Sequence, residues 1–297
     1  MFEHPQLAAL RSILDTGSFE AAADQLGVTP SAVSQRIRAL EIKLGGPVLT
    51  RAMPITATDL GATIVAHAHD LARLNAGLES ELGAPSSLLI SIAVNADSLA
   101  TWFLPALCDQ GPLRFDVQVV DQAHSDRDLA QGKVAAAVTM RADPVAGADV
   151  VALGALRYVA TATPDFVRHH FPDGLTRDAF ALAPALIFSD KDSLQSDWAS
   201  TVVNQKVVLP SHRLPSTRGF VDAAVLGLGW GLNPLPLVKE HLSAGRLVDL
   251  APHAPHDTPL FWQSSRIGRS VLAPLTRSVR RAAQEVLLQP VRDAGAR

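Results

Sequence analysis

Residues 19–51 read FEAAADQLGVTPSAVSQRIRALEIKLGGPVLTR, and this stretch decides the fold of the N-terminal part of the chain. Two short amphipathic helical patterns are separated here at Gly27, and glycine favours the left-handed conformation that ends a helix. Thr29 suits the cap of the second helix and Pro30 suits its first turn. The spacing predicts a helix over about 30–44, with its apolar residues facing inward. Two helices joined by a glycine-containing turn form a helix-turn-helix.

The outer face of the second helix carries side chains that suit contact with duplex DNA. Short hydroxyl and amide side chains at its start can approach base edges, while arginines nearby hold phosphates. Over residues 29–51, four basic side chains face a single acid, although the whole chain has 26 basic and 29 acidic residues. The alternative is a three-helix packing module with a solvated polar face. The candidate DNA-binding residues are Ser31, Ser34, Gln35, Arg36, Arg38 and Arg51.

Two features extend this head. Residues 47–49 and 55–56 predict a short hairpin, which would place Arg51 at a wing tip near a minor groove or the backbone. Thr58 suits the cap of a long helix that runs to about Leu82 with an apolar seam at three- and four-residue spacing. The seam favours pairing with a second copy over packing within its own domain, and two copies would reach half-sites about 34 Å apart. The seam residues are Leu60, Ile64, His67, Leu71, Leu74, Leu78 and Leu82.

Length and composition limit what the chain can be. Its 297 residues allow about two domains of ordinary size. Cys108 is the only cysteine, which excludes an intrachain disulfide framework and a cysteine-built metal site. We see no signal peptide and no apolar run near the ~20 residues needed to cross a bilayer, so we expect a cytoplasmic protein without membrane contact. No nucleophile elbow or phosphate-binding lysine loop occurs, and we expect no catalytic residue, metal or cofactor.

From Leu88 the periodicity becomes that of an α/β domain. Strands alternate with helical segments, which predicts a sheet with parallel strands. Residues 83–87, GAPSS, are the linker candidate, and residues 271–288 read as the last helix. A two-lobed α/β architecture that the chain crosses twice would account for the order of elements. The predicted strands are residues 88–94, 115–120, 134–139, 157–163, 185–188, 206–209, 230–232, 247–250 and 260–263.

Polar residues at strand ends are candidates for binding a small molecule. In an open α/β lobe, ligands bind at the carboxyl ends of strands and at helix N-termini. The Ser98 hydroxyl and nearby backbone N–H groups can receive a carboxylate, helped by the helix dipole. Asp97 can pair with an ammonium or guanidinium, or it is a plain first-turn acid; Asp121 and Asp190 are side-chain cation candidates or exposed loop acids. The candidate effector-binding residues are Asn95, Ala96, Asp97, Ser98, Asp121, Thr139, Ser189, Asp190 and Asn233.

The N-terminal stretch resembles the LysR-type transcriptional regulators. The likeness is carried by SFEAAADQL at 18–26, IRALEIKLGGPVLTR at 37–51 and TDLG at 58–61. It is specific over about the first 65 residues. Pro30 departs from the pattern, because many family members carry there a glutamine that contacts DNA. That contact is not carried over, and operator preference is expected to differ.

The rest of the chain is similar to the lysine- and arginine-responsive, LysG/ArgP-like branch of that family. LLISIAVNADSLATWFLPAL at 88–107, DLAQGKVAAAV at 128–138 and GRLVDLAP at 245–252 carry this likeness. The resemblance implies lysine, arginine or histidine as effector and activation of a basic amino-acid exporter gene. It also implies a homodimer or homotetramer on double-stranded DNA, and contact with RNA polymerase.

The resemblance further implies a division of the chain. The expected parts are a winged helix-turn-helix domain at 1–58, a linker and dimerisation helix at 59–87, and a two-lobed, periplasmic-binding-protein-like α/β effector domain at 88–297. Lobe I would comprise about 88–162 and 266–297, and lobe II about 163–265. Three alternatives remain: a LysR-type regulator of another small carboxylate, an architectural DNA-binding protein, and an enzyme with a DNA-binding head.

Overall fold

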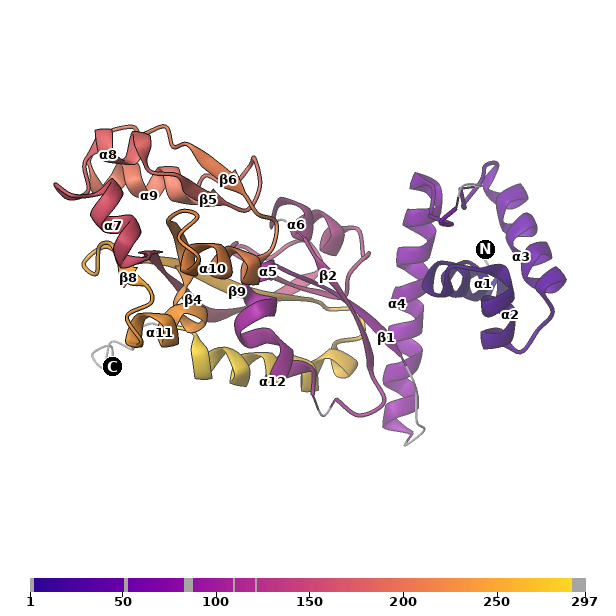
Figure 1. Ribbon diagram of the computed structural model, residues 1–297. Helices are drawn as coiled ribbons and strands as arrows, with labels where there is room; N and C mark the ends of the chain where they lie inside the picture. The colour runs from indigo at the N-terminus through magenta and orange to yellow at the C-terminus, as the bar shows by residue number, and fades with distance from the viewer. Residues whose placement is uncertain (1–2, 51–52, 83–87, 109, 121, 290–297) are drawn as a thin grey trace.

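The computed structural model describes residues 3–50, 53–82, 88–108, 110–120 and 122–289. Figure 1 shows a helical head at one end, a long helix beside it, and a larger α/β domain beyond. The head contains α1 (His4–Thr16), α2 (Phe19–Leu26) and α3 (Pro30–Leu44).

The helices of the head begin and end at the predicted residues. Ser18 Oγ accepts a hydrogen bond from the Ala21 N–H at 3.0 Å, and Thr29 Oγ1 accepts one from the Ala32 N–H at 3.2 Å. Gly27 ends α2 in the left-handed conformation. These caps satisfy backbone groups that a helix end leaves free. The helices enclose one apolar core, which includes Leu7, Leu10, Ile13, Ala22, Ala23, Val33, Ile37 and Leu40.

The predicted short hairpin is present as one antiparallel bridge between Leu49 and Ala57. Backbone hydrogen bonds flank it, from the Thr50 N–H to the Thr56 carbonyl at 2.8 Å and from the Thr58 N–H to the Val48 carbonyl at 3.1 Å. The Thr50 and Thr56 hydroxyls form a hydrogen bond of 2.9 Å beside it. Pro47 and Pro54 bracket this segment, and neither has an N–H to donate to a strand ladder, so a longer hairpin is disfavoured. The wing-tip prediction for Arg51 lies outside the described residues.

The long helix α4 (Asp59–Glu81) begins after Thr58, whose hydroxyl accepts from the Gly61 N–H at 3.0 Å. The residues of the predicted apolar seam of α4 are partly buried in the head and partly exposed to solvent. Ile64 is buried in the core of the head, whereas Leu74 and Leu78 are 53% and 57% exposed. None of the helices in the described ranges is long and apolar enough to cross a membrane.

The helix α4 packs tightly against the effector domain as well as against the head (Figure 1). Its Gly77 lies so close to α12 (Arg269–Val286) that an added Cβ would be 2.8 Å from Ser270 Oγ. A Cβ on Gly268 would be 2.6 Å from the Cβ of Arg73. Two glycines therefore allow α4 and the start of α12 to approach closely, and α4 is held to the lobe that contains α12.

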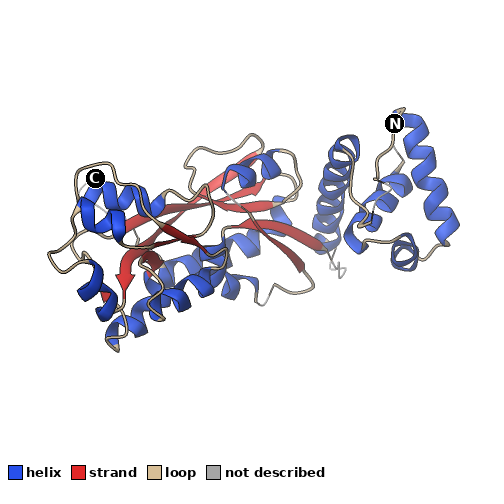
Figure 2. Ribbon diagram, turned by 45° about the horizontal axis from the view of Figure 1, so that its top comes forward, coloured by secondary structure: helices blue, strands red, loops and turns tan. Residues whose placement is uncertain are grey.

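The α/β domain is built on one mixed sheet with strand order β2-β1-β3-β9-β4-β7, and β8 also pairs with β4. The first strand pairs in parallel with its two neighbours, as predicted, while β9 runs antiparallel to β3 and β4. Figure 2 shows these strands as one layer with helices on both sides. The strands are β1 (Leu89–Val94), β2 (Arg114–Val119), β3 (Ala136–Thr139), β4 (Ala148–Ala162), β7 (Gly231–Pro234), β8 (Val248–Asp249) and β9 (His256–Ser265).

Two long strands, β4 and β9, join the lobes, which agrees with the prediction that the chain crosses twice. Lobe I holds the helical run α5 (Ala96–Ser98), η1 (Leu99–Phe103) and η2 (Leu104–Leu107), together with α6 (Gln122–Ala130) and α12. Lobe II holds β5 (Ala185–Ile187), β6 (Ser211–Arg213), α7 (Pro164–His170), α8 (Arg177–Leu182), α9 (Leu194–Val202), α10 (Thr217–Val225) and α11 (Leu235–Ser243).

One strand prediction was wrong, and two helices of lobe II, α7 and α8, were not predicted. Residues 206–209 form no strand; the strand that pairs with β5 lies at Ser211–Arg213 instead. The Val207 side chain is buried in the core. The apolar character of this segment therefore serves side-chain packing, and its backbone does not join a sheet. The carbonyl of Pro210 then accepts the Ala185 N–H at 2.8 Å and sets the register of β6.

A cluster of ionisable side chains lies where α1 meets α4. Asp15 Oδ1 is 3.7 Å from His69 Nε2, and Asp15 Oδ2 is 3.9 Å from Arg11 Nε. Burial raises the pKa of Asp15 to about 6, opposed by Arg11. Burial also lowers the pKa of His69 to about 4, with Arg11 and Arg73 adding to the effect. The native state therefore favours an uncharged form of both side chains.

These two residues oppose each other in the pH dependence of stability. The stabilisation of the folded state by Asp15 is fully present below its ordinary pKa of 3.8 and is lost as pH rises through about 6. The stabilisation by His69 is present above its ordinary pKa of 6.5 and is lost as pH falls through about 4. The wild-type protein should therefore show little pH dependence from this cluster between about pH 4 and 6.5.

Asp15→Asn is expected to remove the pH-dependent contribution of Asp15 to the free energy of unfolding and to leave that of His69. The difference between about 6 and 3.8 corresponds to about 3 kcal/mol at neutral pH, and residual solvation reduces this to about 2 kcal/mol. The variant should be more stable than wild type by about that amount at pH 7.5 and equal to it near pH 4. Urea unfolding at both pH values measures the difference. A variant destabilised equally at both would contradict the assignment.

Candidate functional site

The outer face of α3 is open to solvent along its length. Ser34, Gln35 and Arg38 are exposed, while Ile37 and Leu40 on the opposite side are buried. The Ser31 and Thr29 hydroxyls form a hydrogen bond of 3.0 Å at the start of the helix, and Arg36 is half-buried. Ser31, Ser34, Gln35, Arg36 and Arg38 thus share one helix that presents its polar face outward.

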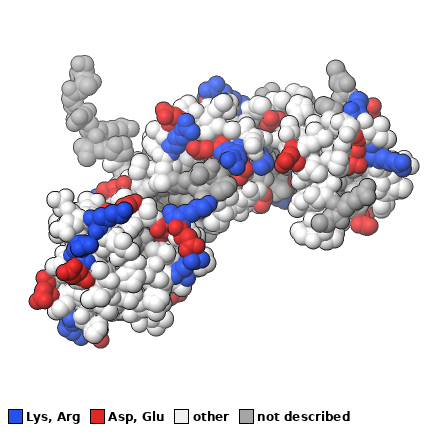
Figure 3. All heavy atoms as spheres, turned by 90° about the horizontal axis from the view of Figure 1, so that it is seen from above, with Lys and Arg blue, Asp and Glu red and all other residues white. Residues whose placement is uncertain are grey.

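The charges elsewhere do not form a single basic surface. Figure 3 shows lysine and arginine side chains interspersed with acids over the face that it displays. With 26 basic and 29 acidic residues, the chain as a whole offers no general attraction to a polyanion. Any affinity for DNA must therefore come from a local surface such as that of α3.

A cavity of about 570 Å³ lies between the two lobes. Its lobe I wall comes from the residues that follow β1 and β2, and its lobe II wall comes from the segment after β5 and from the start of α10. The apolar part of the lining includes Val120, Phe188, Phe220 and Leu232. A cavity of this size suits a small organic ligand, with an apolar surface and a few polar groups to orient it.

Asp97 is the central polar side chain of this cavity. Asn95 caps the helix by accepting from the Ser98 N–H at 3.0 Å, which leaves Asp97 free to reach across the cavity. Its Oδ2 accepts from the Tyr158 hydroxyl at 2.6 Å and its Oδ1 accepts from the Thr217 hydroxyl at 2.8 Å. These bonds join lobe I, the crossing strand β4 and lobe II.

The environment of Asp97 favours pairing with a cation. Burial raises the pKa of the Asp97 carboxyl, opposed by the hydrogen bonds from Tyr158 and Thr217. Burial and the nearby Asp97 raise the pKa of Tyr158 well above its usual range, so Tyr158 remains a neutral donor. A buried carboxylate with remaining lone pairs lowers its free energy when a positive group of a ligand comes into contact with it.

Other charged side chains around the cavity come from lobe II and β9. Asp192 accepts from the backbone N–H of Phe188 at 2.8 Å, and Asp197 accepts from the Ser193 hydroxyl at 2.6 Å. Lys191 also lines the cavity, as does His256 on β9. The lining therefore has three carboxylates, Asp97 included, against one lysine and one histidine.

Two buried amides in the lining have unused acceptors. Asn233 donates from Nδ2 to Thr161 Oγ1 at 2.9 Å, while its Oδ1 has no hydrogen-bond partner among the described residues. Gln195 Oε1 likewise has none within the described ranges. Because an unpaired buried carbonyl is costly, these oxygens are suited to receive N–H donors when the lobes rearrange around a ligand.

The structure brings together five of the nine candidate effector residues and separates the others. Ser98, Thr139 and Asp190 do not line the cavity, and Asp121 lies outside the described residues. The five that line it are Asn95, Ala96, Asp97, Ser189 and Asn233.

The three residues outside the lining lie in other surroundings. Ser98 is fully buried, its N–H donates to Asn95 Oδ1 at 3.0 Å, and its Oγ has no hydrogen-bond partner among the described residues. Because Ser98 does not line the cavity, the structure does not support our expectation that it receives a carboxylate there. Thr139 is buried and donates to the Arg141 carbonyl at 3.3 Å. Asp190 is exposed and pairs with Arg213 at 2.5 Å.

Several lining residues could not be found by inspecting strand ends. Tyr158, in the middle of β4, is the only tyrosine in the chain, and that rarity was the one available signal. Thr217 follows the cap residue Ser216 at the start of α10, a position that also suits an ordinary first-turn residue. Their closeness to Asp97 depends on packing between residues 61 and 120 positions apart.

A helix-turn-helix head joined by a long helix to a two-lobed domain with an interlobe cavity defines a ligand-responsive DNA-binding regulator. Comparisons with known proteins define the family. Residues 4–62 match the bacterial regulatory helix-turn-helix protein, lysR family, and residues 88–287 match the LysR substrate binding domain. The chain therefore belongs to the LysR family of transcriptional regulators.

Individual relatives cover nearly the whole chain. The HTH-type transcriptional regulator LysG of Mycobacterium tuberculosis is 41% identical over 283 residues, which is 94% of this chain and 93% of the relative. The crystal structure of ArgP from Mycobacterium tuberculosis is 40% identical, with a TM-score of 0.81, and the match covers 96% of this chain and 99% of that one. Full-length LysG from Corynebacterium glutamicum with bound effector Arg is 38% identical, with a TM-score of 0.67 and coverage of 97% and 100%.

Proposed function

We propose that this regulator responds to a basic amino acid, lysine, arginine or histidine, bound in the interlobe cavity. The observation that carries the proposal is the excess of carboxylates, Asp97, Asp192 and Asp197, over the single Lys191 in the lining. Lysine and arginine each bring two positive groups and one carboxylate, which matches that arrangement of charge. The similar LysG with bound Arg supports the same ligand class.

The proposed pose places the positive side-chain end of the effector against Asp97. The α-carboxylate then lies toward Lys191, the one lysine of the lining. The start of α9 is not open to it, because the Leu194 N–H already donates to Asp192 Oδ1 at 3.1 Å. The orphaned oxygens of Gln195 and Asn233 are available to accept from the remaining N–H donors of the effector.

A calorimetric titration of the full-length protein with each of the twenty amino acids tests this function. Lysine, arginine or histidine should bind selectively and be recovered unchanged. Glutamate, which carries an extra negative charge, should show binding at least about 100-fold weaker. Equal binding of glutamate or of simple carboxylates would instead support a regulator of another small carboxylate, and turnover of the ligand would support an enzyme.

Binding in the cavity can alter how the reading heads sit on DNA. The effector contacts both lobes, and α4 is held to lobe I through Gly77 and Gly268. A change in lobe angle would therefore move α4 and the head, provided that the effector binds one arrangement better than the other. In this account residues 1–58 form the reading head, 59–87 the linker and 88–297 the effector domain. The protein acts in the cytoplasm on an exporter gene and contacts RNA polymerase.

We further propose that α4 pairs with its counterpart in a second copy, in a dimer or tetramer. Leu74 and Leu78 remain exposed on a helix whose other faces are packed against the head and the effector domain. Leu74→Glu with Leu78→Glu should shift the protein toward a monomer in sedimentation velocity and reduce operator affinity at least tenfold. Leu182→Glu, at an exposed leucine of α8, is the matched control and should leave assembly unchanged. An unaltered sedimentation profile in the double variant would place the interface elsewhere.

A further inference from the structure

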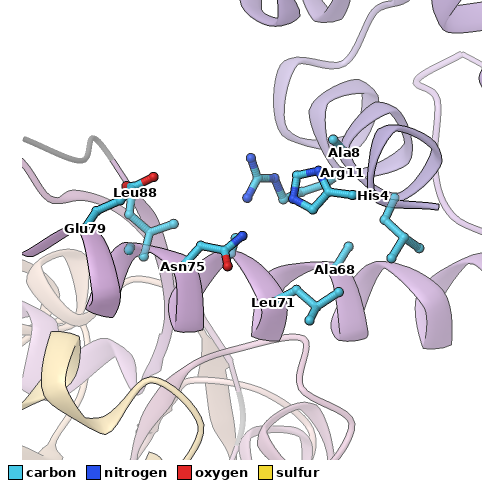
Figure 4. A pocket seen from close by; sticks show the side chains of 11 residues that line it. His4, Ala8, Arg11, Ala68, Leu71, Asn75, Glu79 and Leu88 are labelled. Carbon is cyan, nitrogen blue, oxygen red and sulfur yellow. The ribbon is translucent and has the colours of Figure 1, made fainter. Parts of the chain in front are cut away.

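A second cavity lies between α1 and α4, separate from the interlobe cavity (Figure 4). Its volume is about 210 Å³, and none of its lining residues belongs to the interlobe cavity. The head contributes α1, the linker contributes α4, and Leu88 at the start of the effector domain completes the lining. A molecule held here would contact all three parts of the regulator.

One polar atom of this cavity's lining residues has no hydrogen-bond partner. The Arg11 Nε is buried and has none among the described residues, although Arg11 is ion-paired with Asp15, whose Oδ2 is 3.9 Å from Nε. Figure 4 shows Arg11 and His4 of α1 directed into the space above Asn75 of α4. The terminal nitrogens of a guanidinium can bind a carboxylate in a bidentate manner.

The remaining lining is apolar and limits the size of a ligand. Ala68, Leu71 and Ala72 of α4 and Ala8 of α1 belong to this lining. Figure 4 labels Ala8 on α1 and Ala68 and Leu71 on α4. The volume of about 210 Å³ has room for a small organic molecule rather than a drug-sized one. Pentanoate, with five carbons and two oxygens, is a small aliphatic probe of this class. Glu79 lies toward the Leu88 end of the cavity and disfavours a second carboxylate there.

We propose that this cavity is a second ligand site, which takes a small aliphatic monocarboxylate. The carboxylate is received by the Arg11 guanidinium, with His4 and the Asn75 amide as further donors, and the aliphatic chain lies over Ala68 and Ala72. A ligand seated there holds α1 against α4 and so fixes the position of the head. This site is independent of the basic amino-acid site, and its occupancy does not require Asp97.

Isothermal titration of the full-length protein with pentanoate, pentanamide and pentylammonium tests the proposal. Pentanoate should bind with a dissociation constant of roughly 1 mM, and the neutral and cationic analogues should bind at least tenfold more weakly. Arg11→Gln should weaken pentanoate binding at least tenfold, and Arg11→Lys should retain part of it. Ala8→Leu fills the cavity without changing its charges and should abolish binding, whereas Ala130→Leu, at an exposed alanine of α6, should not.

Two controls separate this site from the effector cavity and from a failure to fold. Each variant should retain arginine binding and the helical circular dichroism of wild type, and Asp97→Asn should bind pentanoate as wild type does. Equal binding of pentanoate and pentanamide would overturn the proposal. So would pentanoate binding that persists in both Arg11→Gln and Ala8→Leu, or that is lost in Asp97→Asn.

Discussion

Asp97→Asn is expected to weaken arginine binding by at least about 100-fold. Leaving a ligand cation without its buried carboxylate commonly costs about 2–5 kcal/mol, and each 1.4 kcal/mol is a factor of about ten. Asparagine preserves the shape of the side chain and can still bond to the Tyr158 and Thr217 hydroxyls. Because burial raises the pKa of Asp97, loss of its charge should not destabilise the ligand-free protein. Calorimetric titration with arginine measures the affinity.

Asp190→Asn is the matched control for this experiment. Asp190 also follows β5 in the region of the cavity, but it is exposed, pairs with Arg213 and does not line the cavity. Its replacement should change arginine affinity by less than about twofold, because exposed ion pairs contribute little. If Asp97→Asn and Asp190→Asn weakened binding equally, or if neither did, Asp97 would not be the cation-binding residue.

Gln35→Ala is expected to reduce discrimination between operator and scrambled duplex by about 5- to 150-fold. A side-chain amide that bonds to a base edge contributes about 1–3 kcal/mol of discrimination. Gln35 is exposed in the first half of α3, six residues after the cap at Thr29. Competition binding on the two duplexes, performed at one fixed salt concentration, measures the ratio.

Arg38→Gln provides the contrast on the same helix face. Arg38 is exposed and is expected to contact phosphate. Its loss should weaken binding to both duplexes by the same factor and lower the salt slope of binding by about one. If the ratio of operator affinity to scrambled-duplex affinity were unchanged in Gln35→Ala, Gln35 would not contact a base. If the salt slope of binding were unchanged in Arg38→Gln, Arg38 would not contact a phosphate.

The head was predictable because its information is local. Ser18, Gly27, Thr29 and Pro30 define helix ends within a few positions of one another, and a repeated apolar spacing defines the buried faces. The short hairpin that follows was predictable for the same reason, since its two segments pair through Leu49 and Ala57, and two prolines without N–H donors keep the pairing short. Each of these outcomes follows from backbone chemistry over fewer than about ten residues.

The interlobe site was predictable only in part, because its contacts are long-range. Asp97 and Asn95 could be proposed from their position after a strand, but sequence position did not tell which of the neighbouring side chains faces the cavity. Successive helical residues are rotated by about a quarter turn or more, and so Ser98 is directed into lobe I while Asp97 is directed across the cleft. The partners Tyr158 and Thr217 are brought there by tertiary packing alone.

The central claim is that a basic amino acid in the interlobe cavity changes how the α3 helices are placed on DNA. The most direct test is a footprint of the full-length protein on a duplex selected from random sequence, with and without arginine. We expect arginine to change the length or position of the protected region for wild type and to leave it unchanged for Asp97→Asn. A selected duplex whose wild-type footprint is the same with and without arginine, lysine and histidine would contradict the account.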